Sequence, residues 1–301
     1  MRPHSSALDD SGGPLRRVLR LLSRCAVDHP LVWFFALAYV GSWAAVFSMV
    51  LLDGPSELMT VFGLSPLAAA LITHRLATGN WRAFRLFGSW PRSLAALALG
   101  IVLVTLAFII LPVLAVVDVS KLNWGALTPI SLFFSTSPLA GPLPEEPAWR
   151  GYALPLLEAK FGALSGAVLL ALLWAPWHLP LFLLPGFSSA PSWMFALIVV
   201  THSILLTIAT NLAHFAVLPA IVMHWVFNNS AGVLSGLLAN VELSATLSFE
   251  LVMGLCGLAV AFAGIILTKG QLAYSRTSTG HTPVSLPAPP AESNQVASPK
   301  K

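Results

Sequence analysis

Three short motifs place ionisable and amide side chains within an otherwise apolar chain. They are Glu145, Glu146 and Arg150 in GPLPEEPAWRG (141–151), Trp174 and His178 in WAPWHLP (174–180), and His224 and Asn228 in MHWVFNNS (223–230). A carboxylate and an imidazole that converge on one water molecule can deprotonate it for attack on a carbonyl carbon. A second imidazole and a carboxamide can donate hydrogen bonds to the oxyanion that develops. Together the motifs hold the groups that amide hydrolysis needs.

The spacing within each motif predicts which side chains share a helix face. Glu146 and Arg150 are four residues apart, so a helix would bring them together as an ion pair. Glu145 would point about 100° away from that pair, free to face a cavity. His224 and Asn228 are also four apart and would project together. The prolines beside the two glutamates indicate that a helix begins here, because proline is tolerated in a first turn.

Water is the predicted nucleophile, because the motifs offer no suitable serine or cysteine. Ser230 lies at the end of the third motif, and Cys256 is in an apolar run. A zinc ion, Zn²⁺, held by Glu145, His178 and His224 would be an alternative way to activate water, resembling open sites with two histidines and one carboxylate. The H-E-x-x-H spacing of many zinc peptidases is absent. The residues leave both schemes open.

The composition is that of a membrane protein. The 301 residues are 56% hydrophobic and 9% charged, with a mean hydropathy of +0.81, whereas soluble domains are about a quarter charged. An ionisable side chain such as Asp, Lys or Arg at the centre of a span costs about 2.5–3.5 kcal/mol on insertion scales, so such residues are functional candidates by default. The fold class predicted is an all-α, polytopic membrane helical bundle.

About eight transmembrane helices are predicted, because each span needs about 20 apolar residues. Six are clear in the sequence, at 31–52, 94–117, 164–184, 192–210, 214–239 and 246–268. Two weaker spans contain prolines, at 57–74 and 124–142. The sequence is accordingly divided into a basic cytoplasmic segment (1–30), a transmembrane bundle (31–268) and a cytoplasmic tail (269–301) that is predicted to be disordered, most clearly over its Pro- and Ser-rich part, 277–301.

Basic residues predict the orientation of the bundle. They occur before the first span, after the second and fourth spans and after the last, while the alternate loops hold only Lys121. Cytoplasmic loops are enriched in Lys and Arg, so both termini are predicted to lie in the cytoplasm. The arginines before the first span indicate contact with anionic membrane lipids rather than with nucleic acid.

The three motifs together resemble those of a known family. EEPAWR matches E-E-x-x-x-R, WAPWH resembles F-x-x-x-H with Trp174 in place of Phe, and HWVFN matches H-x-x-x-N. Their order on successive apolar segments resembles the CPBP family of intramembrane proteases, over a core at about 140–235. That family includes type II CAAX prenyl endopeptidases and bacterial relatives associated with bacteriocin processing or self-immunity.

The resemblance implies a role for each motif residue. Glu145 would activate water with help from His178, His224 and Asn228 would form the oxyanion site, Glu146 and Arg150 would hold the first motif or orient substrate, and Trp174 would supply an aromatic wall. It favours glutamate-activated water, as in the eukaryotic-type enzymes, with zinc as the alternative. It also implies a peptide or protein substrate and a location in a bacterial cell membrane. The leading hypothesis is an intramembrane endopeptidase that cuts near the cytoplasmic face of the membrane.

Two other classes of function fit the same residues. A proton-coupled transporter could use a buried glutamate and histidine as a relay, although no internal repeat is evident. A non-catalytic membrane immunity or scaffold protein could retain the motifs for binding alone. Outside the motifs, His202 and His214 are predicted to be structural or interfacial, and Glu158 with Lys160 to form a solvated cytoplasmic turn.

Overall fold

The computed structural model describes residues 14–116, 118–128, 136–139, 141–188, 190–241 and 249–275, and the regular elements in these ranges are all helical. The α-helices are α1 (Pro14–Asp28), α2 (Pro30–Leu51), α3 (Leu58–Thr78), α4 (Trp90–Thr105), α5 (Leu111–Val116), α7 (Pro142–Ala148), α8 (Leu154–Phe161), α9 (Ala163–Trp177), α10 (Ser192–Leu212), α11 (Leu218–Leu237) and α12 (Phe249–Leu267). Two π-helical turns, η1 (Leu106–Ile110) and η4 (Trp149–Ala153), join α4 to α5 and α7 to α8. The 3₁₀ turns are η2 (Val119–Lys121), η3 (Trp124–Ala126) and η5 (Leu179–Leu183).

Length and composition identify membrane-spanning helices within the described residues. Six stretches are long and apolar enough to cross a membrane: Pro30–Leu51, Leu58–Thr78, Trp90–Ala115, Ala163–Leu183, Ser192–Leu212 and Phe249–Leu267. The continuous stretch α7–η4–α8 and helix α11 lie among them. The prediction of an all-α membrane bundle is confirmed, and these eight stretches agree with the predicted number of about eight spans.

The predicted span at 124–142 is wrong in the part of it that the structure describes. Residues 124–128, 136–139 and 141 form a 3₁₀ turn and irregular chain, and the rest up to residue 140 lies outside the described residues. A helical stretch instead begins at Pro142 and ends at Phe161. Proline removes a backbone donor that a helix interior needs, but it fits the first helical position, and Pro142 occupies that position in α7.

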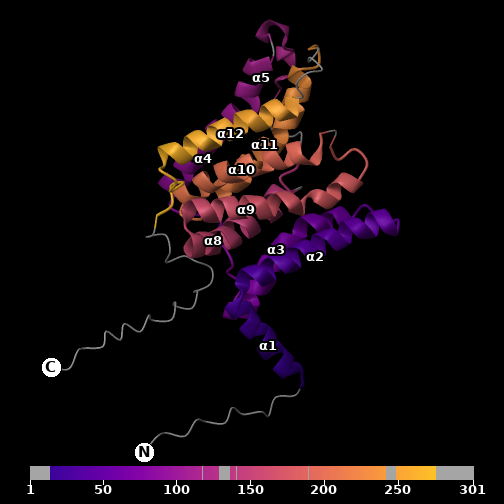
Figure 1. Ribbon diagram of the computed structural model, residues 1–301, viewed down its shortest axis with the longest axis vertical. Helices are drawn as coiled ribbons and strands as arrows, with labels where there is room; N and C mark the ends of the chain where they lie inside the picture. Colours follow the sequence, from indigo (N-terminus) through magenta and orange to yellow (C-terminus); the bar gives the residue numbers. More distant parts are fainter. Residues whose placement is uncertain are drawn as a thin grey trace, which may run out of the picture.

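The transmembrane helices form two groups, a pair of helices and a stack of helices that lies beside it. Figure 1 shows α2 and α3 running side by side, with α9, α10 and α12 stacked next to them. Helix α1 lies at the end of the α2–α3 pair, where the Ser23 hydroxyl donates to the backbone carbonyl of Leu76 at 2.6 Å. The amino-terminal helix is therefore fixed against the end of α3.

The loops define two ends of the bundle. At one end, which we call the basic end, the backbone N–H groups of Val217 and Leu218 donate to the carbonyls of Arg85 and Leu86. The basic end holds residues 79–89, 162, 213–217 and 268–275. At the other, which we call the distal end, the N–H of Asn123 donates to the carbonyl of Leu237. The distal end holds residues 52–57, 118–128, 184–188, 190–191 and 238–241.

Charge is distributed unevenly between these ends. Side chains near the basic end include Arg82, Arg85, Arg92, Lys160 and Lys269. Among the described loop residues of the distal end, Lys121 is the one basic side chain, and Asp53, Glu57 and Asp118 are acidic. The asymmetry that the sequence analysis used to predict orientation is thus an asymmetry between two ends of one bundle.

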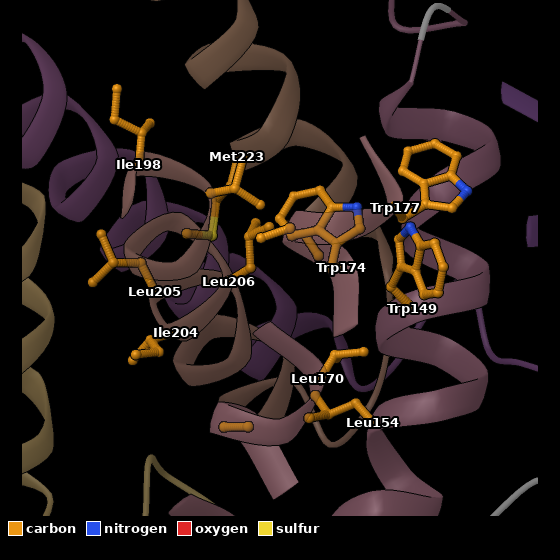
Figure 2. Close-up of a cluster of buried hydrophobic side chains, with 14 of the residues drawn as sticks. Trp149, Leu154, Leu170, Trp174, Trp177, Ile198, Ile204, Leu205, Leu206 and Met223 are labelled. Atoms are coloured by element: carbon orange, nitrogen blue, oxygen red, sulfur yellow. The ribbon is translucent and has the colours of Figure 1, made fainter. Parts of the chain in front are cut away.

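Aromatic packing fixes the first motif in the centre of the bundle. Trp149 and Tyr152 are fully buried, and the ring of Trp149 lies 5.6 Å from that of Trp177 between centroids. Figure 2 shows Trp149 and Trp177 beside each other, with Trp174 and Leu170 nearby. Helix association in a membrane depends on van der Waals packing rather than on burial from water. Close contacts of large rings therefore position the helix that carries the two glutamates.

The chain after α12 also packs on the bundle. Leu272 is fully buried, and the Asn211 side-chain amide donates to the Leu272 carbonyl at 3.1 Å and to Glu158 Oε1 at 2.8 Å. The prediction of a solvated turn at Glu158 is wrong, because this side chain is 2% exposed and faces an amide of α10. Residues 269–275 of the predicted tail lie on the bundle, and 276–301 lie outside the described residues.

Candidate active site

A cavity of about 810 Å³ lies in the half of the bundle nearer the distal end. Its walls include Met59 and Phe62 from the first half of α3, and Leu181 from η5. Leu139 and Leu143 also line it and are exposed at the protein surface, at 69% and 42%. The cavity therefore extends from the interior to the surface beside the start of α7.

The four predicted catalytic side chains line this cavity together. Glu145 comes from the start of α7, His178 from the end of α9, and His224 and Asn228 from α11. The rest of the lining is mostly apolar, so these polar groups stand out on its wall. Three segments that are far apart in the sequence thus contribute to one site.

Glu145 is buried and held at one of its two oxygens. The indole N–H of Trp174 donates to Oε2 at 2.9 Å, and the carboxylate is 5% exposed. Within the described residues no hydrogen bond to Oε1 is seen. An oxygen that faces a cavity and lacks a protein donor is placed to accept a hydrogen bond from water. Trp174, predicted as an aromatic wall, therefore also orients the carboxylate.

The tautomer of neutral His178 follows from its hydrogen bond. Its Nδ1 lies 3.0 Å from the backbone carbonyl oxygen of Trp174. A carbonyl oxygen only accepts, so Nδ1 carries the proton and donates, which leaves Nε2 with a lone pair. The ring packs against Trp177 and Phe195 at centroid distances of 4.8 and 5.3 Å. His178 is thus a fixed imidazole with a free acceptor nitrogen.

Glu146 binds two cationic or potentially cationic partners. Its Oε1 lies 3.2 Å from Arg150 Nη1 and 2.7 Å from His224 Nδ1. The ion pair predicted between Glu146 and Arg150 is confirmed. The contact with His224 was not predicted, and it joins the first motif to the third. A carboxylate that accepts from Nδ1 fixes the orientation of the imidazole and leaves Nε2 for a ligand.

Arg150 is a buried structural cation and not a loop residue. Its side chain is fully buried, Nη2 donates to the Ser203 hydroxyl at 2.9 Å, and the guanidinium carbon lies 4.1 Å from the Trp174 ring centroid. Arg150 was one of the basic residues counted after the fourth predicted span, and its use as an orientation signal was therefore wrong. The other basic residues still separate the two ends. Arg150 lies in the π-helical turn η4, and such turns occur frequently at functional sites.

Gly141 forms the wall between Glu145 and Asn228. It has φ +121°, a backbone conformation that favours glycine. A Cβ atom at this position would lie 3.0 Å from Glu145 Oε1 and 3.7 Å from Asn228 Nδ2. A side chain here would occupy the space beside the free carboxylate oxygen, so the absence of one keeps that oxygen accessible.

The described part of the chain holds no recognisable zinc site. Within the described residues, no group of three or more His, Cys, Asp or Glu side chains is spaced to hold a metal ion. The set of Glu145, His178 and His224 proposed from the sequence does not fit that requirement. We therefore derive no chemical step through zinc.

His202 and Ser203 are site residues that the sequence analysis missed. His202, predicted to be structural, is 1% exposed and lines the cavity. Ser203 binds Arg150, as described above. A signal was present for Ser203, because polar residues recur along α10 at Ser203, Thr207 and Thr210, a spacing that marks one helix face. By contrast, His214 lies at the basic end, 3.1 Å from Arg92.

Comparison with known families agrees with this geometry. Residues 127–230 match the sequence model of one family, described as type II CAAX prenyl endopeptidase Rce1-like. This segment is Rce1-like. The match includes all three motifs and every cavity residue from α7, α9, α10 and α11. The family resemblance inferred from the motifs is confirmed over this segment, and at a coarse level it supports a membrane protease. None of the curated proteins compared matches the chain.

Proposed function

We propose that this protein is an intramembrane endopeptidase in which Glu145 activates water for hydrolysis of a peptide bond. The observation that carries this proposal is the convergence of Glu145, His178, His224 and Asn228 on one cavity. The Rce1-like match over residues 127–230 supports the same reaction class. The proposal uses only side chains of the chain itself.

The first step is attack by water. A water molecule in the cavity donates a hydrogen bond to Glu145 Oε1 and lies within reach of the acceptor Nε2 of His178. Glu145 takes one proton as the water oxygen forms a bond to the carbonyl carbon of the substrate. The carbonyl π electrons move to its oxygen, which becomes an oxyanion. Trp174 keeps both partners in place, because it donates to Glu145 and accepts from His178.

The oxyanion is stabilised by the third motif. The amide of Asn228 can donate to it, and so can Nε2 of His224 when that nitrogen is protonated. Glu146 accepts from Nδ1 and so fixes the orientation of this imidazole.

Collapse of the tetrahedral intermediate completes the reaction. The carbonyl double bond re-forms as the bond from carbon to nitrogen breaks. The leaving amine nitrogen takes the proton that Glu145 removed from water. Glu145 is regenerated as a carboxylate, and the products are a carboxylic acid and an amine.

The substrate class follows from the cavity and the membrane. A mostly apolar cavity that reaches the surface suits a membrane-associated peptide, and CAAX-type and bacteriocin-related peptides are the candidates. With the basic end in the cytoplasm of a bacterial cell, the cavity lies in the half of the bundle away from the cytoplasm. This proposed arrangement differs from the predicted cleavage near the cytoplasmic face, because Glu145 lies in the half of the bundle nearer the distal end.

Cleavage of defined peptides tests the proposal. Purified protein in detergent is given a panel of internally quenched peptides, some CAAX-type and prenylated and others hydrophobic without a lipid. We expect cleavage by the wild type, with kcat/KM about 10²–10⁴-fold lower in Glu145→Ala and His178→Ala. Glu57→Ala and His29→Ala are matched controls, because both residues are exposed and lie outside the cavity. Cleavage that both site variants retain contradicts the proposal.

A further inference from the structure

Two polar side chains beside the third motif have no part in the proposed reaction. Trp225 and Asn229 follow His224 and Asn228 by one residue each on α11, so they lie on a neighbouring face of the helix, about 100° around its axis. Asn229 is 2% exposed, Trp225 is half-buried, and neither lines the cavity. Their hydrogen bonds show what this second face of α11 holds.

Both side chains bind the main chain of one residue, Thr136. The indole N–H of Trp225 donates to the Thr136 carbonyl at 2.9 Å, and the Thr136 N–H donates to Asn229 Oδ1 at 2.9 Å. The Asn229 amide nitrogen donates to the Trp225 carbonyl at 2.8 Å, which fixes the end of the carboxamide that faces Thr136. Trp225 and Asn229 thus form a clamp that engages both the N–H and the C=O of one residue.

Thr136 belongs to a segment that forms part of the cavity wall. We call residues 136–139 and 141 the mouth segment, because Ser137, Leu139 and Gly141 line the cavity and Leu139 is exposed at the surface. The mouth segment is irregular chain, without the repeating backbone hydrogen bonds of a helix. One of its ends leads into α7, and the clamp ties the other to α11. The position of this wall therefore depends on the clamp.

The mouth segment lies beside the predicted catalytic carboxylate. Gly141 is the residue whose missing side chain leaves room at Glu145 Oε1. Glu145 itself is held separately, by its place in α7 and by the indole of Trp174. A displaced mouth segment would thus alter the wall that a peptide packs against more than it would move Glu145. A wall that already has its bound conformation lowers the conformational cost of binding.

We propose that Trp225 and Asn229 are positioning residues for substrate binding, which act by holding the mouth segment against α11. This inference rests on the proposed endopeptidase function and gives a role to two residues that the motifs leave unused. Two faces of α11 then contribute to the site. His224 and Asn228 face the cavity, and Trp225 and Asn229 fix its wall.

Steady-state kinetics test this role. Trp225→Phe keeps an aromatic ring but removes the donor to Thr136, and Asn229→Ala removes the acceptor. With one peptide in detergent, each variant should raise KM about three- to tenfold, the effect of losing one hydrogen bond, while kcat stays within about twofold of wild type. This split indicates lost binding that ground and transition states share. If Asn229→Ala does not fold, the milder Trp225→Phe decides the test.

The mobility of the mouth segment can be measured without substrate. A nitroxide is attached to Leu139→Cys in a Cys25→Ala, Cys256→Ala background, and its EPR spectrum is recorded with the clamp intact and with each clamp residue substituted. We expect narrower lines, which mean faster motion, in Trp225→Phe and in Asn229→Ala. This measurement does not depend on catalysis.

Two residues elsewhere in the bundle provide matched controls. The indole N–H of Trp43 donates to a backbone carbonyl, and Asn211 is a buried asparagine whose amide donates to the Leu272 carbonyl near the basic end. Neither residue lines the cavity. Trp43→Phe and Asn211→Ala should leave KM and the nitroxide spectrum unchanged, even where they lower the melting temperature.

Three results would overturn the inference: an unchanged KM in the clamp variants, an unchanged nitroxide spectrum, or an equal rise of KM in the two controls, which would indicate a general loss of stability. Failure of the proposed function is distinct. If Glu145→Gln cleaves the peptide as the wild type does, the water-activation scheme fails, while the nitroxide spectra still report whether the clamp holds the mouth segment.

Discussion

The Nδ1 atom of His224 lies 2.7 Å from Oε1 of Glu146, so the second glutamate of the first motif orients the histidine of the third. Glu145, its neighbour, faces the cavity and accepts from Trp174 instead. Two adjacent carboxylates therefore have different tasks. In the proposed mechanism Glu145 acts on water, whereas Glu146 holds Arg150 and His224 in position.

Loss of Glu146 should destabilise the fold. Glu146→Ala leaves the buried Arg150 without its carboxylate, and breaking a buried ion pair in this way costs about 3–5 kcal/mol. Unfolding by denaturant or heat in detergent measures the change. Glu57→Ala, at an exposed glutamate, is the control and should change stability by less than about 0.5 kcal/mol. Equal stability of the two variants would show that Glu146 does not hold the network.

The indole N–H of Trp174 should matter for rate more than for folding. Trp174→Phe keeps an aromatic ring next to Arg150 but removes the donor to Glu145. A hydrogen bond to a charged group contributes about 1.5–3 kcal/mol, so we expect kcat/KM to fall at least about tenfold. Trp43→Phe is the matched control, because this indole also donates to a backbone carbonyl, that of Trp177, and Trp43 itself does not line the cavity. A wild-type rate in Trp174→Phe would contradict the positioning role.

Substitutions of different size at Gly63 should affect stability and activity differently. Gly63 lies within α3 on the cavity wall, and a Cβ atom there would meet no atom within 4 Å. Gly63→Ala should therefore raise stability by about 0.5–1 kcal/mol, the cost of glycine in a helix, with little change in KM. Gly63→Trp should fill part of the cavity and raise KM.

Gly41 offers a comparison for that experiment. A Cβ atom at Gly41 would lie 2.7 Å from the Ser65 hydroxyl oxygen, so Gly41→Ala should lower stability. If Gly63→Trp folds and cleaves peptides with an unchanged KM, the cavity is not the substrate site.

Cysteine labelling in intact cells measures the orientation of the bundle in the membrane. Cys25 in α1 is exposed and near the basic end, so an impermeant maleimide should not reach it if that end is cytoplasmic. Lys121→Cys, in a Cys25→Ala background, places a thiol at the distal end and should be labelled. The reverse pattern would place the basic end outside the cell and the cavity in the cytoplasmic half.

Local spacing predicted much of the site. Four-residue intervals identified the pair Glu146–Arg150 and placed His224 and Asn228 on one face of α11. Apolar length identified most spans, since helices in a membrane must satisfy their own backbone groups. These properties depend on a single segment, and the sequence displays them directly.

Features that depend on contacts between segments were harder to predict. The proline-rich stretch before Glu145 satisfied a rule for apolar length, yet its described residues, 124–128 and 136–139, are a 3₁₀ turn and irregular chain, and the helix that carries Glu145 begins at Pro142. Glu158 was predicted to be solvated because Lys160 is nearby, but it is buried and accepts a hydrogen bond from the side-chain amide of Asn211 in α10. His202 has no polar partner on its own helix, and only the packing of α9, α10 and α11 reveals that it faces the cavity.

The most direct test of the account compares wild type with Glu145→Gln in two measurements on one peptide. This substitution preserves the size of the side chain and its ability to accept a hydrogen bond from Trp174, but removes the base. We predict that cleavage falls about 10²–10⁴-fold, while the melting temperature and the dissociation constant of the peptide stay close to those of the wild type. Cleavage at the wild-type rate by a folded Glu145→Gln protein would contradict the claim that Glu145 activates water.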